Sequence, residues 1–161
     1  MNLVEIPAEF KQWIWLLAPR PCNLVTTVST DGRVNVATMY SSQIISYQFT
    51  PRSPLASNLV SFSVHRSRHT YECVNETGEF VVNTPGLEII EAVEKAGLTR
   101  PKARNEALSL GLTPVESQKV EPPRLAECLA HLECKVTEVQ RQGDYHLVIG
   151  RVIAASARES V

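Results

Sequence analysis

The chain has 161 residues, of which 43% are hydrophobic and 20% charged, a composition that suits one globular domain with a single core. Sixteen Lys and Arg residues nearly balance 17 Asp and Glu residues, and the net charge of -1 argues against a broad basic surface for nucleic acid or an anionic membrane. The apolar run at 13–18 is too short to span a bilayer, and the first ten residues lack the basic region of a signal peptide. We therefore expect a cytoplasmic protein with one domain, residues 1–161, and no nucleic-acid or membrane partner.

Four cysteines, Cys22, Cys73, Cys128 and Cys134, form no Cys-x-x-Cys pair, and a chain of this size folds without disulfides, so we expect reduced thiols. The segment that holds Cys128, His131 and Cys134 alternates like a strand. Residues three apart on a strand point to opposite faces, so we expect no metal site there.

The first half of the chain predicts a helix, a hairpin, a loop and a strand. Apolar residues at helical spacing indicate an amphipathic helix at 9–18. Residues 21–46 read as two β-branched strands joined near Asp31 and Gly32, a dipeptide suited to a tight turn. Residues 47–58, rich in Pro and Ser, predict a loop. The strand at 59–64 should place Val60, Phe62 and Val64 on one face and two serines on the other.

The second half predicts three short helices and a second hairpin. One helix should begin at Ser67 as N-cap and stop at Gly78, before a strand at 79–83. Two more helices, within 87–97 and 100–111, each close on a glycine. Strands at 131–139 and 145–155 flank Gly143 and Asp144 as a hairpin. Hairpin connections of this kind favour a mainly β, closed or nearly closed antiparallel barrel with peripheral helices.

A group of cations stands directly ahead of the predicted helix at 67–77: His65, Arg66, Arg68 and His69 lie within five residues. A helix start carries partial positive charge and favours anions, so the group indicates a missing negative ligand. A polar strand face, Ser61 and Ser63, leads into this turn, and Thr70 lies in the first turn of the helix. These donors suit the phosphate of a mononucleotide. A solvated surface turn of Arg and His residues is the alternative.

A second polar stretch follows the Asp31–Gly32 turn. Asn35, Ala37, Met39 and Ser41 share one face of the predicted strand, while Thr38 and Tyr40 share the other. The small side chain of Ala37 would let a flat ring lie near the backbone; an ordinary amphipathic strand is the alternative.

The sequence contains no G-x-G-x-x-G, Walker A, G-x-S-x-G or H-E-x-x-H motif. The usual dinucleotide-binding, phosphoryl-transfer, hydrolase and zinc-protease functions therefore lack support.

These segments, in this order, resemble the flavin reductase-like, FMN-binding split barrels. The resemblance rests on "RPCNLVTTVSTDGRVNVATMYSS", "RSRHTYECVNETGEFVVNTP", "GLTPVESQKVEPPRLAECLAHLECKV" and "LVIGRVIA". It implies an antiparallel, Greek-key-like split β-barrel that forms a homodimer, with one FMN per subunit near the interface. It also implies hydride transfer from NADH or NADPH through FMN to a small acceptor. The alternative function is a flavoredoxin-like electron carrier reduced by a protein partner; a barrel that binds haem or nothing is a third.

The resemblance also assigns cofactor contacts. From the first hairpin it implies flavin contacts by Asn35, Ala37 and Thr38, with Tyr40 and Ser41 near the ring. It places Ser61 and Ser63 along the ribityl and phosphate path, and Arg66, Arg68, His69 and Thr70 at the phosphate. Because the cofactor itself carries the hydride, no catalytic side chain is expected.

Overall fold

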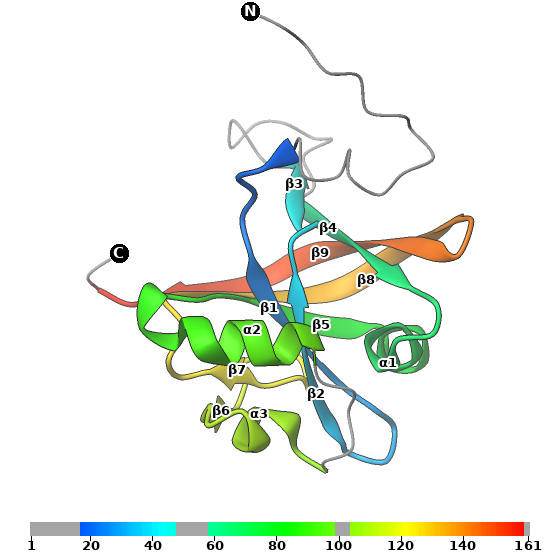
Figure 1. Cartoon of the computed structure of the whole chain (residues 1–161). Helices are drawn as coiled ribbons and strands as arrows, with labels where there is room; N and C mark the ends of the chain where they lie inside the picture. Colours follow the sequence, from blue (N-terminus) through cyan, green and yellow to red (C-terminus); the bar gives the residue numbers. More distant parts are fainter. Residues whose placement is uncertain (1–16, 48–57, 99–103, 160–161) are drawn as a thin grey trace, which may run out of the picture.

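The structure, a computed structural model, describes residues 17–47, 58–98 and 104–159 (Figure 1). Seven strands form one antiparallel sheet in the order β2-β1-β5-β8-β9-β4-β3. Their bounds are β1 Asn23–Val28, β2 Val34–Met39, β3 Gln43–Ser46, β4 Leu59–His65, β5 Glu79–Thr84, β8 Ala130–Gln142 and β9 Tyr145–Ala157. The prediction of a mainly β, antiparallel fold with peripheral helices is confirmed. The predicted helix at 9–18 lies almost wholly outside the described residues, as does most of the loop at 47–58.

The link between β2 and β3 shapes the sheet. The sequence predicted one strand through this region, but β2 ends at Met39 and β3 begins at Gln43 on the opposite edge of the sheet. Ser42 fixes this break, because its hydroxyl donates to the Met39 carbonyl (3.2 Å) and accepts from the Asn23 side chain (2.7 Å). A three-residue link can join opposite edges only if the sheet curls around. The result is a nearly closed, split barrel.

The core lies on both sides of this curled sheet. Val60, Phe62 and Val64 of β4 all belong to one buried cluster, as their alternation predicted. Phe62 meets Phe80 of β5 edge to face, with ring centroids 5.1 Å apart. β2 contributes to two clusters, because Met39 packs in the Phe62 cluster while Val36 packs in a second one under the helices.

Helix α1, His69–Thr77, follows β4 and stops at Gly78, which has a φ of 69° and so favours glycine. The predicted N-cap was wrong. Arg68 holds that position and makes no side-chain cap, because the Ser67 hydroxyl lies 2.8 Å from Nδ1 of His65 instead. The start of α1 therefore keeps its unpaired N–H groups.

Helix α2, Ile90–Leu98, is preceded by a 3-10 turn, η2 Leu87–Ile89. We expected it to stop at Gly97, but the helix continues through that residue to Leu98. Helix α3 is a single turn, Glu106–Ser109, capped by the Asn105 side chain. In Figure 1, β2 passes between the end of α2 and α1.

The remaining strands are a long hairpin and a small second sheet. β8 and β9 form the expected long hairpin around Gly143, which has a φ of 65°. Two short strands, β6 Pro114–Val115 and β7 Arg124–Leu125, pair beside the main sheet.

All four cysteines are free. Within the described ranges, no helix is both long enough and apolar enough to cross a bilayer.

Candidate functional site

A cavity of about 230 Å³ opens along the outer edge of β2, between the start of α1 and the end of α2. It brings together most residues that the sequence assigned to cofactor binding: Asn35, Ala37, Thr38, Tyr40, Ser41, Ser63, Arg68, His69 and Thr70. The predicted hairpin and three of the four predicted cations, His65, Arg68 and His69, therefore line one cavity.

The cavity follows an edge of the sheet whose backbone groups have no neighbouring strand. β2 is an outermost strand of the sheet, and the chain at the start of α3 satisfies part of its edge. Val34 N–H donates to the carbonyl of Arg104, just before α3 (3.1 Å), and Val36 N–H donates to Oε2 of Glu106 (3.0 Å). The two-residue period of a strand turns the N–H of Thr38 to the same edge. Thr38 lines the cavity, so its backbone N–H is available there as a hydrogen-bond donor.

A buried hydrogen-bond chain joins β2 to α1 at one end of the cavity. The side-chain amide of Asn35 donates to the hydroxyls of Thr27 and Thr70, both at 3.0 Å. Thr70 is only 2% exposed, so its position is well fixed. Because its oxygen accepts from Asn35, its O–H hydrogen remains available as a donor at the start of α1.

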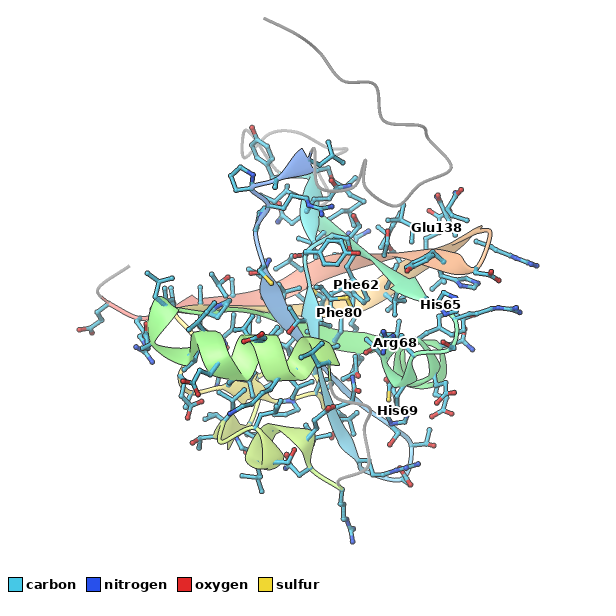
Figure 2. The ribbon with its side chains drawn as sticks, in the orientation of Figure 1. Phe62, His65, Arg68, His69, Phe80 and Glu138 are labelled. Carbon is cyan, nitrogen blue, oxygen red and sulfur yellow. The ribbon has the colours of Figure 1, made fainter. Side chains whose placement is uncertain are left out.

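Arg68 supplies the charge at this end. It is the N-cap residue of α1 and has no ion pair with any described residue. Among the described residues that line the cavity, it is the only one with a permanent charge. Figure 2 shows His65, Arg68 and His69 gathered at the start of α1. An unpaired guanidinium beside an uncapped helix start is a binding arrangement for a phosphate.

His69 is held by its own helix. Its Nδ1 lies 3.0 Å from Oε2 of Glu72, and its Nε2 lies 3.5 Å from Sγ of Cys73. Burial raises the pKa of the Cys73 thiol, which therefore stays protonated and can donate to Nε2. With both ring nitrogens engaged, His69 lines the cavity without a free N–H donor.

At the other end, the side chains of Thr38 on β2 and of Ser41, two residues after β2, bond to neighbouring elements. The Thr38 hydroxyl donates to the Val93 carbonyl of α2. The Ser41 hydroxyl accepts from the Ser63 N–H (3.0 Å) and lies 3.2 Å from the Ser63 carbonyl. These three predicted residues therefore line the cavity while also fixing its walls.

Two predicted residues lie outside the cavity lining. The Arg66 guanidinium forms an ion pair with Asp144 (3.1 Å), and the Arg66 N–H donates to the Asp144 carbonyl. Ser61 is buried on β4, and its hydroxyl has no hydrogen-bond partner among the described residues. The structure brings neither side chain to the start of α1.

Several lining residues were not assigned from the sequence: Val36, Met39, Val64, His65, Ala96, Gly97 and Tyr145. Ala96 and Gly97 lie at the end of the apolar face of α2, where the sequence predicted only the end of a helix. Their small side chains could have indicated that another element approaches closely. A Cβ at Gly97 would indeed lie 3.6 Å from Thr38 of β2. Tyr145 is the first residue of β9, and no local pattern links it to β2.

Known proteins resemble this chain in sequence and in fold. Residues 16–161 match the flavin reductase like domain family. An uncharacterized protein of Archaeoglobus fulgidus is 34% identical over 133 residues, covering 83% of this chain and 71% of that protein. An uncharacterized protein of Bacillus subtilis, YwrF, is 33% identical over 149 residues, covering 89% of this chain and 71% of the relative.

A solved structure gives the same architecture. Nitrilotriacetate monooxygenase component B from Bacillus cereus superimposes with a TM-score of 0.82 at 24% identity, covering 99% of this chain and 84% of that one. At this identity the likeness concerns the fold. The match over residues 16–161 decides the family: this chain belongs to the flavin reductase like domain family, a family of flavin-dependent redox proteins.

Proposed function

We propose that the protein is an FMN-binding oxidoreductase that transfers a hydride from NADH or NADPH through bound FMN to a small acceptor. The observation that carries this proposal is the start of α1, where the unpaired Arg68, the fixed Thr70 hydroxyl and uncapped N–H groups meet one cavity. A dianionic phosphate satisfies all three at once. No described carboxylate lines this cavity to oppose it.

The residues present fit a flavin along the length of the cavity. Arg68 and Thr70 would hold the phosphate, and Asn35 would keep Thr70 in place. The edge of β2 around Thr38 would face the polar rim of the ring system, with Ala37 small enough to let a ring approach. Tyr40 and Ser63 would close the sides.

The bound flavin would supply the redox chemistry, since it accepts a hydride from a nicotinamide and passes electrons on. The protein's part is to bind, orient and partly cover the ring. For that reason we assign no catalytic side chain. Thr38 and Ser41 would hold the walls around the ring in place. The Thr38 hydroxyl bonds β2 to α2, and the Ser41 hydroxyl bonds the chain after β2 to β4.

We also propose that the protein forms a homodimer with the flavin near its interface. Large apolar side chains are exposed on and next to β3, with Ile44 at 70% exposure and Tyr47 at 65%. Tyr40 is half exposed as well, and it lines the cavity. A second copy that packs on these side chains would cover the cavity too.

The test of this function is the absorption spectrum of the purified protein before and after anaerobic addition of NADH or NADPH. The proposal expects a yellow protein that bleaches with at least one nicotinamide. A bound flavin that neither nicotinamide bleaches would favour the flavoredoxin-like carrier, which receives electrons from a protein partner. A protein that binds no flavin would contradict both functions.

A variant pair tests the phosphate assignment directly. Replacing Arg68 and Thr70 together by Ala should weaken FMN binding much more than riboflavin binding, because riboflavin lacks the phosphate. Charge-assisted hydrogen bonds contribute about 1.5–3 kcal/mol each, so we expect losses of about tenfold or more per contact. Arg66→Ala is the matched control, since its guanidinium pairs with Asp144 outside the cavity. Equal losses for both ligands would place the phosphate elsewhere.

A further inference from the structure

His65 lies where strand β4 ends and the chain turns towards α1. It is half-buried, and it lines the proposed flavin cavity together with Arg68, His69 and Thr70. Figure 2 shows its side chain beside those of Arg68 and His69 at the start of α1. The phosphate contacts proposed above give this imidazole no function, although it lies at the same end of the cavity.

The β8–β9 hairpin fixes the position of the His65 ring. His65 pairs with Tyr145 in the ladder between β4 and β9. Their two rings meet edge to face, with centroids 5.1 Å apart and an interplanar angle of 85°. The next residue, Arg66, donates its N–H to the carbonyl of Asp144 at 3.0 Å. Strand pairing and ring contact therefore limit the movement of the imidazole.

Ser67 decides which nitrogen of this ring carries the proton. The backbone N–H of Ser67 donates to Nδ1 of His65 at 3.1 Å, and the Ser67 hydroxyl lies 2.8 Å from the same nitrogen. A backbone N–H can only donate, so Nδ1 must accept and carries no proton. The ring is then the neutral tautomer with its hydrogen on Nε2.

The Nε2–H of His65 is a free donor. Within the described part of the chain it has no hydrogen-bond partner and no ion pair, and it is not enclosed by protein atoms. Because His65 lines the cavity, a ligand there can accept this hydrogen. The bond from Ser67 to His65 also leaves α1 without a serine cap, so the same contact keeps the helix N–H groups open to a ligand.

Three donors from three places in the chain then surround one end of the cavity. Arg68 is the N-cap residue of α1, Thr70 lies in its first turn, and His65 ends β4. A phosphate monoester has three terminal oxygens, and each can accept a hydrogen bond. The imidazole adds a donor from outside the helix and adds no charge.

We propose that His65 binds the flavin phosphate through Nε2–H as a neutral donor, and that Ser67 is the positioning residue that holds the imidazole in this tautomer. The inference rests on the proposed function, because it requires a flavin phosphate at Arg68. It assigns to His65 part of the preference for FMN over riboflavin, which has no phosphate.

The test compares the affinities of the apoprotein for FMN and riboflavin by quenching of flavin fluorescence. His65→Phe keeps a ring beside Tyr145 and removes the donor, so FMN should bind about tenfold more weakly and riboflavin should change by less than about twofold. His65→Gln, whose amide N–H can replace the donor, should restore part of the loss. His146→Phe is the matched control. The ring of His146 stacks on Tyr71 (4.3 Å) and does not line the cavity, so this variant should keep the parent's affinity ratio.

A double-mutant cycle tests the role of Ser67. Ser67→Ala removes the hydroxyl and keeps the backbone N–H, so FMN should bind about two- to threefold more weakly. In a His65→Phe background the same change should have no effect, because Ser67 acts through His65. Equal losses in both backgrounds would show that Ser67 acts on the phosphate without His65.

Nitrogen-15 NMR of the imidazole in the FMN complex tests the tautomer. At pH 8 the spectrum should show a neutral ring with its hydrogen on Nε2. A hydrogen on Nδ1, or on both nitrogens, would overturn the assignment of a neutral Nε2–H donor.

The outcomes keep this inference separate from the proposed function. If His65→Phe leaves the ratio of FMN to riboflavin affinity unchanged while Ala at Arg68 and Thr70 lowers it, His65 is not a phosphate ligand and the proposed function stands. If the parent protein binds neither flavin, the proposed function fails first, and this inference fails with it.

Discussion

The ring of Phe80 on β5 occupies the space in which a side chain at Gly150 on β9 would begin. A Cβ placed on Gly150 would overlap Cζ and Cε1 of Phe80 and crowd Cβ of Cys134 at 3.3 Å. Phe80 is fully buried and packs edge to face on Phe62 (Figure 2). Because the ring is buried, β9 can approach Phe80 this closely at residue 150 only without a side chain.

Gly150→Ala should therefore destabilise the fold by about 1–3 kcal/mol, the usual effect of overpacking a core. Chemical denaturation of the variant measures the change in the free energy of unfolding. In a Phe80→Leu background the smaller side chain should relieve the overlap, so that the two changes couple by about 1 kcal/mol or more. Strictly additive effects would mean that the two residues do not compete for the same space.

This contact lies beyond what the sequence predicts. The alternation of β4 predicted which face is buried, and Val60, Phe62 and Val64 do form part of the core. Alternation acts within one strand, however, and the approach of Gly150 to Phe80 depends on how β5, β8 and β9 curl together. The same limit explains why Tyr145 was not assigned to the cavity.

The local errors have local causes. A serine next to a helix start is usually its cap, but Ser67 bonds to His65, and the cap position passes to Arg68. Gly97 was read as a stop because glycine often ends helices, yet the helix continues because Ala92, Val93 and Ala96 keep its apolar face buried. A local hydrogen bond decided the first case, and tertiary packing of α2 decided the second.

Asn35 should be a positioning residue for phosphate binding. Its amide donates to the hydroxyls of Thr27 and Thr70. Asn35→Asp would replace this donor by a carboxylate oxygen, which can only accept, and would add a buried negative charge at the phosphate end. We expect the affinity for FMN to fall by about tenfold or more, with a smaller loss for riboflavin. Titration of both ligands checks this, and Asn35→Ala separates the loss of the hydrogen bonds from the added charge. A riboflavin loss as large as the FMN loss would point to a general distortion of β2.

Asn83 should be one of the most important polar residues for stability. It is fully buried, donates to the Leu24 carbonyl (3.1 Å) and to Thr26 (3.2 Å), and accepts from the Leu125 N–H (3.0 Å) and His131 (2.9 Å). Asn83→Ala should lower the free energy of unfolding by about 2–4 kcal/mol, because it leaves several buried partners unsatisfied. His131→Ala removes one of these contacts and should have a smaller effect, about 1 kcal/mol. Similar losses for the two variants in denaturant melts would argue against a central role for Asn83.

The cysteines should differ sharply in reactivity. Cys22 is exposed, whereas Cys73, Cys128 and Cys134 are buried, and burial raises the pKa of Cys128 and Cys134 to about 12. Because the thiolate is the reactive form, a native thiol titration at pH 8 should label Cys22 and spare the other three. Unfolding in denaturant should expose them all. Rapid native labelling of a Cys22→Ser variant would show that the core opens more readily than its packing indicates.

Glu106 should make stability fall as pH rises. Its side chain is 1% exposed and Oε1 has no hydrogen-bond partner among the described residues. Burial raises its pKa above the usual value of 4.5, although the Val36 N–H and His69 act in the other direction. Between pH 4.5 and the raised pKa, the Glu106 carboxyl of the folded state therefore holds a proton that the unfolded state has released.

The sign of the effect follows from this difference in bound protons. Because the folded state binds more protons than the unfolded state, the free energy of unfolding must decrease as the pH rises from 4.5 through the folded-state pKa. The stabilisation from the protonated Glu106 carboxyl is fully present below pH 4.5 and is lost as the pH rises above the raised folded-state pKa. Glu106→Gln keeps an oxygen that can accept from Val36 and removes the titration, so the variant should gain stability relative to the parent as the pH increases. Denaturant melts of both proteins across pH 4 to 8 give the comparison, with Glu91→Gln, an exposed change on α2, as control. A difference between Glu106→Gln and the parent that is constant with pH would mean that burial does not raise the pKa of this carboxyl.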